Sequence, residues 1–410
     1  CGRRKMGVPG AAAYDLVGNL KTETMKRVPT TGTFVTAGDS ILNGDYAGNG
    51  IPTRIAHKSG GKYRLMGRYT VGGTKTDQIL ASQIPLAVAN QKAMFVLVNG
   101  GTNDIAQGLR QDGTTGGTSA VGEATARVNF AKIVAAIAAA GKIPISFGMT
   151  PASSGNQLYH ANHELWRLLW CARNGIPHIH AWPSLAQANG NYATGLGLDT
   201  VHPNSLGADL AALAGIAQID RLWSCNPFGE LIDRSGGILP NAVSFGGVGA
   251  ALPSGYFSSG SGATYAVEAP VDGSFGNWLT TTYTSAVNLV GWNATPSNAV
   301  SNGYNIGDRV AVGFRMQTVA AGEQTLKPRI SISGLTMDYG SATVAQGAQP
   351  ILFDDWSGAS GEDMWVYYEG NITGGTSINL SVLATTTGTT TQKLRIQRPI
   401  IYNLTANGLA

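Results

Sequence analysis

The sequence has little charge and no long apolar segment. Charged residues make up 13% of the 410 residues, about half the usual share, whereas glycine is abundant, with 56 residues. This balance is more typical of a loop-rich extracellular protein than of a cytosolic one. No apolar run approaches the roughly 20 residues that a membrane-spanning helix needs, and we expect no membrane partner. Because the chain begins at Cys1, we expect a processed or trimmed start.

Cysteine and other metal ligands are also scarce. The three cysteines, Cys1, Cys171 and Cys225, lack metal-binding spacing and could form at most one disulfide. Cys171 falls in a predicted helix, where a free buried thiol is expected. His178 and His180 alternate along a predicted strand and therefore share one face, but no carboxylate or cysteine accompanies them at ligand spacing. We therefore predict no metal and no cofactor.

Charge is distributed unevenly between the two halves of the chain. Residues 1–225 carry 20 Lys and Arg against 12 Asp and Glu, and residues 226–410 carry 8 against 12. A basic first half weakly favours an anionic ligand, although an ordinary solvated surface is the commoner explanation. No basic stripe is interleaved with aromatic residues, so we expect no nucleic-acid partner.

The length and the change of pattern along the chain indicate two domains. Residues 1–30 are basic, lack a clear periodicity and are interpreted as an N-terminal arm or linker. A first domain is predicted over 31–225, a linker over 226–245, and a second domain over 246–410.

Strands and helices alternate through the first predicted domain. Apolar runs predict strands near 34–35, 94–98, 143–147 and 176–182. Helical spacing, exemplified by Phe130, Ile133, Val134 and Ile137, predicts helices that include 130–137, 162–173 and 205–223. Such an alternation is typical of a parallel sheet flanked by helices.

The second half has the period-two pattern of strands. Val310, Val312, Phe314 and Met316 alternate with small or polar residues, which predicts an all-β sandwich or jelly roll. Its many aromatic residues could stack on sugars or simply fill the core. Around 365–368 we expect one alternating pair to be buried and the other exposed.

Acidic residues bracket Trp356 in the second half. Asp354-Asp355 and Glu362-Asp363 could hold Ca²⁺. A solvated acidic loop is the interpretation we prefer.

Four motifs of the first half carry candidate chemistry. Gly38-Asp39-Ser40 follows a predicted strand and presents Ser40 at its tip. A serine nucleophile needs a base and a carboxylate that orients the base, and Asp199-Thr-Val-His202 offers both in one loop. Taken alone, Ser40 could instead be a helix cap, and Asp199 a turn residue.

Oxyanion donors are the remaining requirement of acyl chemistry. Asn103, in Gly101-Thr102-Asn103-Asp104, follows a strand that ends at the same edge as Ser40. Gly72-Gly73 supplies backbone that a ligand can approach closely. The choice between these two glycines stays open, although Gly73 is preferred.

In their order along the chain, these motifs resemble the four blocks of the SGNH (GDSL-type) hydrolase family over about residues 31–225. The resemblance implies a three-layer, flavodoxin-like α/β domain. It implies Ser40 as nucleophile, His202 as general base and Asp199 as its orienting group. It also implies an oxyanion hole formed by the Ser40 N–H, the Gly73 N–H and the Asn103 amide. The chain contains no Gly-x-Ser-x-Gly, which argues against the α/β-hydrolase elbow.

These features predict a serine esterase that removes acyl groups, most simply O-acetyl groups, from a polysaccharide. The appended β domain resembles surface modules of bacteriophage tail proteins and could bind carbohydrate, which suggests an extracellular or virion-associated deacetylase, trimeric if attached to a tail. One alternative is a lipolytic or general carboxylesterase that uses the same triad. The other is a carbohydrate-binding structural tail protein with a vestigial hydrolase domain.

Overall fold

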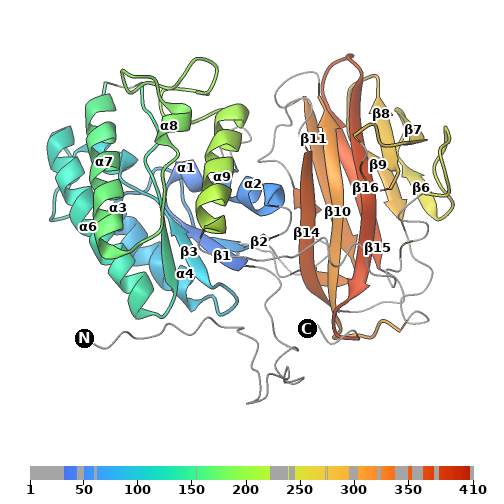
Figure 1. Cartoon of the computed structure of the whole chain (residues 1–410), viewed down its shortest axis with the longest axis horizontal. Helices are drawn as coiled ribbons and strands as arrows, with labels where there is room; N and C mark the ends of the chain where they lie inside the picture. Colours follow the sequence, from blue (N-terminus) through green and yellow to red (C-terminus); the bar gives the residue numbers. More distant parts are fainter. Residues whose placement is uncertain are drawn as a thin grey trace, which may run out of the picture.

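The structure is a computed structural model with two halves that lie side by side (Figure 1). The predicted arm at 1–30 lies outside the described residues, as does almost all of the predicted linker at 226–245. Within the part of the chain that is described, no helix is both long and apolar enough to cross a membrane. The described residues are 32–43, 50–59, 62–153, 155–221, 239, 245–272, 274, 276–294, 303–320, 325–337, 350–352, 363–373 and 378–406.

The first half is built on a parallel sheet with strand order β2-β1-β3-β4-β5. Its strands are β1 (Gly32–Ala37), β2 (Tyr63–Arg68), β3 (Phe95–Val98), β4 (Ile143–Phe147) and β5 (His178–Ile179). The helices are α1 (Ser40–Asn43), α2 (Ile51–Lys58), α3 (Thr76–Gln78), the π-helical η2 (Ile79–Gln83), α4 (Ile84–Ala89), α5 (Thr102–Gln107), α6 (Ser119–Ala139), α7 (Gln157–Asn174), α8 (Trp182–Leu185) and α9 (Ser205–Asp220).

Apolar side chains project from both faces of this sheet, as expected for strands that are covered on both sides. One core joins the sheet to α2, α8 and α9, and includes Phe34, Ile55 and Ala208. The other joins it to η2, α4 and α6, and includes Val96 and Phe130. The predicted three-layer α/β fold is therefore confirmed.

One strand differs from the sequence-based expectation. The strand expected at 176–182 is reduced to two residues, because Ala181 already adopts helical backbone angles and α8 begins at Trp182. The strand that precedes Gly72-Gly73 is β2, which ends at Arg68. The intervening residues 69–71 form an irregular loop. This loop remains hydrogen-bonded to β1 and to Gly38, because the Tyr69 N–H donates to the Thr36 carbonyl and the Val71 N–H donates to the Gly38 carbonyl.

The second half contains two antiparallel sheets. The six-stranded sheet has the order β12-β14-β10-β16-β8-β7, and the five-stranded sheet has the order β13-β11-β15-β9-β6. The strands are β6 (Tyr256–Ser259), β7 (Ala263–Glu268), β8 (Trp278–Tyr283), β9 (Val287–Ala294), β10 (Arg309–Val319), β11 (Leu326–Ser333), β12 (Leu335–Met337), β13 (Pro350–Leu352), β14 (Asp363–Ile372), β15 (Asn379–Thr386) and β16 (Gln392–Asn403).

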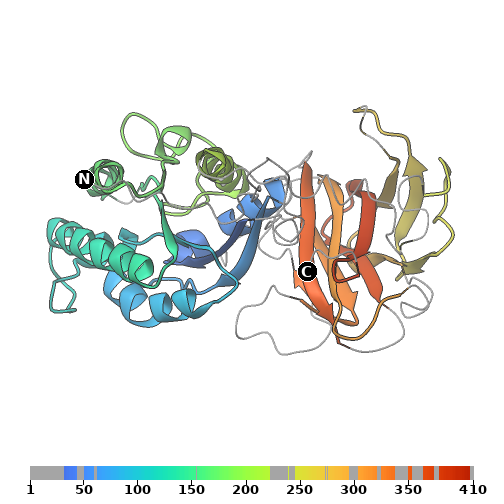
Figure 2. The same ribbon diagram turned by 60° about the horizontal axis from the view of Figure 1, so that its bottom comes forward.

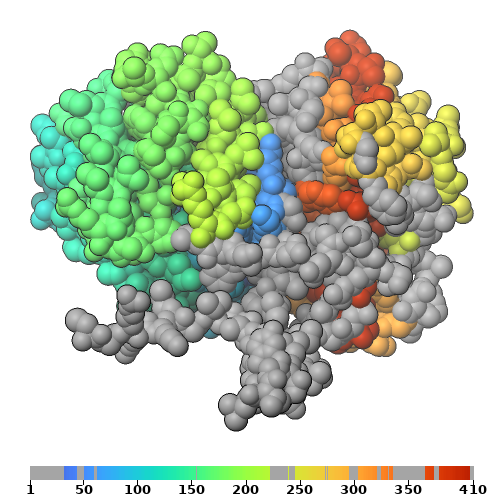
Figure 3. Space-filling model, in the orientation of Figure 1, coloured from blue at the N-terminus to red at the C-terminus, as the bar shows by residue number. Residues whose placement is uncertain are grey.

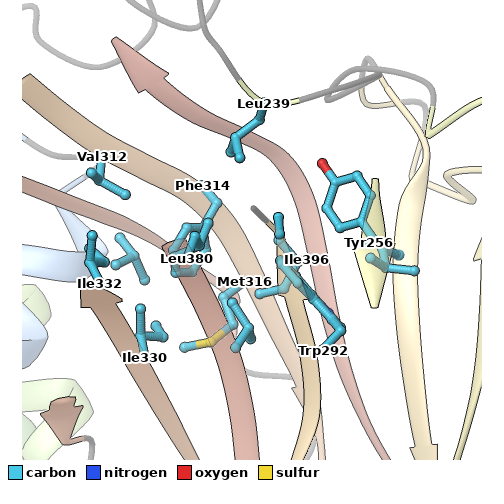
Figure 4. Close-up of a cluster of buried hydrophobic side chains, with 14 of the residues drawn as sticks. Leu239, Tyr256, Trp292, Val312, Phe314, Met316, Ile330, Ile332, Leu380 and Ile396 are labelled. Atoms are coloured by element: carbon cyan, nitrogen blue, oxygen red, sulfur yellow. The ribbon is translucent and has the colours of Figure 1, made fainter. Parts of the chain in front are cut away.

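The core of the second half lies between these two sheets (Figure 4). The alternation predicted along β10 is confirmed, because Val310, Val312, Phe314 and Met316 are all fully buried in this core. Trp292, on the facing sheet, is the largest fully buried side chain. The second half is therefore an all-β sandwich.

The two halves meet along α2 and β2 on one side and β14 on the other (Figure 2). In the space-filling view, the blue surface of the α2 region lies at the boundary between the two lobes (Figure 3). Arg64 of β2 pairs with Glu369 at 2.6 Å, and the Arg64 guanidinium lies over the ring of Tyr367. This contact covers Tyr367, which is buried. Val366 and Tyr368 form the buried alternating pair that was expected, but Tyr367 of the other pair is buried as well.

Candidate active site

Gly38-Asp39-Ser40 forms a tight turn between β1 and α1. Gly38 has φ +151, and a Cβ there would lie 1.7 Å from Oδ1 of Asn99. Only glycine can adopt this backbone and allow the approach. The Gly38 N–H donates to Oε1 of Gln83 at 2.6 Å, and this hydrogen bond fixes the turn to η2.

Asn99, at the end of the neighbouring strand β3, locks this turn. The Asp39 N–H donates to Asn99 Oδ1 at 3.0 Å, and Asn99 Nδ2 donates back to Asp39 Oδ1 at 2.6 Å. The same Asp39 oxygen accepts the Ile41 N–H at 3.0 Å. Burial raises the pKa of the Asp39 carboxyl despite these hydrogen bonds. Asn99 was not predicted from the sequence, although its place directly after a strand beside β1 could have indicated it.

The structure brings Ser40, His202 and Asp199 together as the sequence predicted. His202 Nε2 lies 2.9 Å from Ser40 Oγ, and His202 Nδ1 lies 2.8 Å from Asp199 Oδ2. Ser40 is the first residue of α1, whereas His202 and Asp199 share the loop before α9. Folding therefore brings Ser40 and His202, which are 162 residues apart in the sequence, into one row of hydrogen-bonded side chains.

Asp199 is held in position by its own loop. Its Oδ1 accepts the backbone N–H groups of Val201 and His202, each at 2.7 Å. Partial burial acts to raise its pKa, but these hydrogen bonds and the contact with the His202 ring outweigh burial and lower it below the ordinary value. An ionised Asp199 favours the His202 tautomer that carries its proton on Nδ1 and leaves Nε2 free to accept from Ser40.

Of the two glycines, Gly72 lies beside Ser40. A Cβ at Gly72 would be 3.8 Å from the Cβ of Ser40, whereas a Cβ at Gly73 would meet nothing within 4 Å. Gly73 has φ +76, a left-handed conformation that favours glycine. Within the described part of the chain, no acceptor takes the backbone N–H of Ser40 or Gly73.

Asn103 lies in the first turn of α5 and donates one amide N–H to the Thr74 carbonyl at 3.0 Å. Its second amide proton is a further donor. Asp104, its neighbour, is buried and accepts the Thr76 N–H, at 3.1 Å to Oδ2. Burial raises the pKa of Asp104 to about 6. Both side chains thus join α5 to the loop that carries Gly72 and Gly73.

The other histidines lie away from this row. His57 contacts the second half, His160 Nδ1 lies 3.2 Å from the Thr150 carbonyl, and His163 contacts Arg167. His178 and His180 share a face, as predicted, but the structure adds a carboxylate that the sequence spacing did not indicate. Glu164 of α7 lies within hydrogen-bonding distance of both.

The remaining candidates can be placed only in part. Cys171 is a free thiol buried in α7, as expected, whereas Cys1 and Cys225 lie outside the described residues. Of the acidic loop, Asp354, Asp355 and Glu362 lie outside them too, so the Ca²⁺ interpretation stays untested.

The parallel sheet, its two helical layers and the serine at its carboxyl edge define an SGNH-type α/β domain. Residues 36–210 match the model of the GDSL-like lipase/acylhydrolase family. This match agrees with the family resemblance that the motifs predicted. No curated protein matches the sequence.

Several solved structures are similar to the chain. A GDSL-like lipase from Bacteroides thetaiotaomicron has 19% identity over 48% of this chain and 92% of its own, with a TM-score of 0.39. A member of the lipolytic G-D-S-L family from Veillonella parvula has 19% identity over 46% and 97%, with a TM-score of 0.38. A catalytic mutant of an acetylxylan esterase from Geobacillus stearothermophilus has 14% identity over 46% and 94%, with a TM-score of 0.36.

Proposed function

We propose that the chain is a serine esterase in which Ser40, His202 and Asp199 form the catalytic triad. The observation that carries this proposal is the 2.9 Å contact between Ser40 Oγ and His202 Nε2, within the range of a nucleophile bonded to its base. A vestigial domain retained only for its shape has no need of this alignment, nor of the reciprocal lock between Asp39 and Asn99.

In the acylation step, Ser40 Oγ attacks the ester carbonyl carbon while His202 Nε2 takes the serine proton. The tetrahedral intermediate then collapses, the bond to the alcohol oxygen breaks, and His202 returns the proton to that leaving group. In deacylation, water attacks the acyl-Ser40 carbonyl and gives its proton to His202. The proton passes back to Ser40 Oγ as the carboxylic acid leaves.

The oxyanion of each intermediate needs hydrogen-bond donors that are already in place. The available N–H groups of Ser40 and Gly73, with the second amide proton of Asn103, are the donors that we assign to it. The hydrogen bonds of Asp104 to Thr76 and of Asn103 to Thr74 fix α5 against the segment that follows Gly73. Because the donors are fixed before the reaction, little reorganisation is needed in the transition state.

We propose O-acetyl groups on a polysaccharide as the substrate, cleaved by a secreted or tail-associated enzyme. The Asp199 side chain is 45% exposed, so this end of the triad lies at the molecular surface, where a polymer that carries a short acyl group can approach it. The appended β-sandwich supports a role in holding such a polymer. A lipolytic esterase is the second candidate, because Val71, directly before Gly72, is 52% exposed and offers an apolar contact for an acyl chain.

The hydrolysis of p-nitrophenyl acetate tests the triad. We expect Ser40→Ala to lower kcat by about 10⁴- to 10⁶-fold, in line with nucleophile removal from other serine hydrolases. Ser184→Ala is the matched control, since Ser184 is exposed on α8, and it should leave the rate unchanged. Equal rates for the wild type and Ser40→Ala would show that the triad assignment is wrong.

Substrate class needs a separate measurement. Mass spectrometry of acetylated glycans before and after treatment should show the loss of acetyl groups with the wild type and none with Ser40→Ala. Faster cleavage of long-chain than of acetyl p-nitrophenyl esters, with no change in the glycans, would favour the lipolytic alternative while leaving the triad intact.

A further inference from the structure

A carboxylate and two imidazoles converge at the carboxyl ends of β4 and β5. Glu164 Oε1 lies 3.0 Å from His178 Nε2 and 2.6 Å from His180 Nδ1. One potential ligand atom from each of the three residues lies within 4.8 Å of the others. The two histidines come from β5 and the residue after it, whereas Glu164 comes from α7, so only the packing of α7 on the sheet assembles the group.

Each of these side chains except His180 is fixed by a further contact. His178 Nδ1 lies 3.0 Å from Ser146 Oγ on β4, and the second Glu164 oxygen accepts the Met149 N–H at 2.6 Å. The carboxylate also packs closely over Gly148, where a Cβ would lie 2.5 Å from Oε1. A histidine with its other nitrogen bonded to a polar group is the usual arrangement of a metal ligand.

The exposure of the three side chains is unequal. Glu164 and His178 are 3% and 4% exposed, whereas His180 is 29% exposed. The group is therefore closed on the protein side and open to solvent at His180. Three protein ligands with one open position are the pattern of a zinc site that keeps a water molecule as its fourth ligand.

We propose that Glu164, His178 and His180 bind a divalent transition metal ion, with Zn²⁺ as the best fit. Imidazole nitrogen suits Zn²⁺, whereas Mg²⁺ and Ca²⁺ prefer oxygen ligands throughout. The nearby cation Arg167 donates to the Phe147 and Gly100 carbonyls at 2.8 and 2.5 Å, so these two hydrogen bonds direct its guanidinium to the backbone.

Binding requires a change of tautomer at the two histidines. When Nε2 of His178 binds the ion, its proton moves to Nδ1 and is donated to Ser146 Oγ, since a hydroxyl both donates and accepts. When Nδ1 of His180 binds the ion, its proton moves to Nε2. The ion then replaces the two hydrogen bonds that the Glu164 oxygen otherwise accepts.

This site is separate from Ser40. In the order β2-β1-β3-β4-β5, the strand β5 lies three positions from β1, which is about 14 Å at the usual strand spacing. The metal would join α7 to the edge strand of the sheet and would not contact the reacting ester. We therefore expect it to stabilise the fold and to leave the chemistry of the triad alone.

Titration calorimetry of the untagged full chain with Zn²⁺ tests the site. We expect one equivalent to bind, and Co²⁺ to give the visible absorption of a four-coordinate centre. His180→Asn and Glu164→Gln should abolish this binding, and Ser146→Ala should weaken it by about 10- to 100-fold. Zn²⁺ should also raise the unfolding temperature of the wild type but not of His180→Asn.

His202→Asn is the matched control, because it removes a histidine outside the site and should still bind one equivalent. Loss of binding in His202→Asn together with retention in His180→Asn would place the ion at the triad and overturn the proposal. Absence of Zn²⁺ binding to the wild type would overturn it as well. Should Glu164→Gln fail to fold, His180→Asn decides, since its side chain is partly exposed.

Discussion

His57 Nε2 lies 2.8 Å from the Tyr368 hydroxyl, which joins helix α2 of the hydrolase domain to strand β14 of the sandwich across 311 residues of sequence. Both side chains are buried. Beside them, Glu369 forms ion pairs with Arg64 of the first half and with Arg309 of the second half, each at 2.6 Å. A buried polar contact of this kind favours one fixed orientation of the two halves, because every group in it requires its partner.

The buried state of His57 makes stability depend on pH. Burial, reinforced by the charges of Arg68 and Arg54, lowers the pKa of His57 to about 3 from an ordinary value of 6.5. The unfolded chain therefore binds a proton that the folded chain rejects between these values, and stability falls as the pH drops from 6.5 towards 3. At pH 5 this loss should be about 2 kcal/mol.

Urea unfolding at pH 7.5 and pH 5 checks this expectation. His57→Gln should reduce the difference in unfolding free energy between the two pH values by that amount. Tyr368→Phe removes the hydrogen bond but leaves His57 in place, so it should cost about 1 kcal/mol at both pH values. An unchanged pH dependence in His57→Gln would contradict the assignment.

Glu369→Gln should destabilise the protein strongly. The change removes the charge that two largely buried arginines share, and breaking such a pair costs about 3–5 kcal/mol. Glu268→Gln is the matched control, because Glu268 pairs with Lys393 and Arg395 but is 33% exposed, so about 1 kcal/mol or less is expected. Equal losses of unfolding free energy in the two variants, measured by urea unfolding, would show that burial does not determine the cost at Glu369.

Gly38→Ala should abolish activity and lower stability. The added methyl would overlap Asn99 Oδ1 at 1.7 Å, so the hydrogen bonds between Asn99 and Asp39 that hold the Ser40 turn have to break. Gly141→Ala is the control, since Gly141 also has a positive φ, +75, but a Cβ there meets nothing within 4 Å. We expect that control to cost about 1 kcal/mol, from backbone strain alone. Esterase rates and thermal unfolding of the two variants give the comparison.

Asp199→Asn should lower kcat/KM by about 10³- to 10⁴-fold, because the amide favours the wrong His202 tautomer. The lowered pKa of Asp199 means that its carboxylate persists at lower pH than an ordinary aspartate and is lost only as the pH falls through that lowered value. Rates measured from pH 5 to 8 should therefore show no step from Asp199 in the wild type. A loss of less than tenfold in the variant would argue against an orienting role.

Patterns within single segments were predictable from the sequence. The alternation of Val310, Val312, Phe314 and Met316 identified the buried face of β10, because strand geometry assigns alternate residues to opposite faces. The apolar runs at 94–98 and 143–147 likewise identified two central strands. The strand at 176–182 was overestimated, because its apolar residues continue into α8, and a short apolar run does not distinguish the two structures.

The four motifs of the site were also predictable, because parallel strands bring their carboxyl ends to one edge and so gather loops that are distant in sequence. Asn99 and Asp104 were not assigned their positioning roles, since each acts through a contact with another segment. The metal-binding interpretation of His178 and His180 was set aside for lack of a carboxylate, and that carboxylate comes from α7.

The sequence by itself determined the α/β and all-β halves, the buried faces of their main strands and the residues that meet at Ser40. Only the tertiary structure decided that Glu164 joins His178 and His180, that Asn99 holds Asp39, and that His57 meets Tyr368. The physical reason is that periodicity specifies which face of an element is buried, whereas the partner of a buried polar group depends on how separate elements pack.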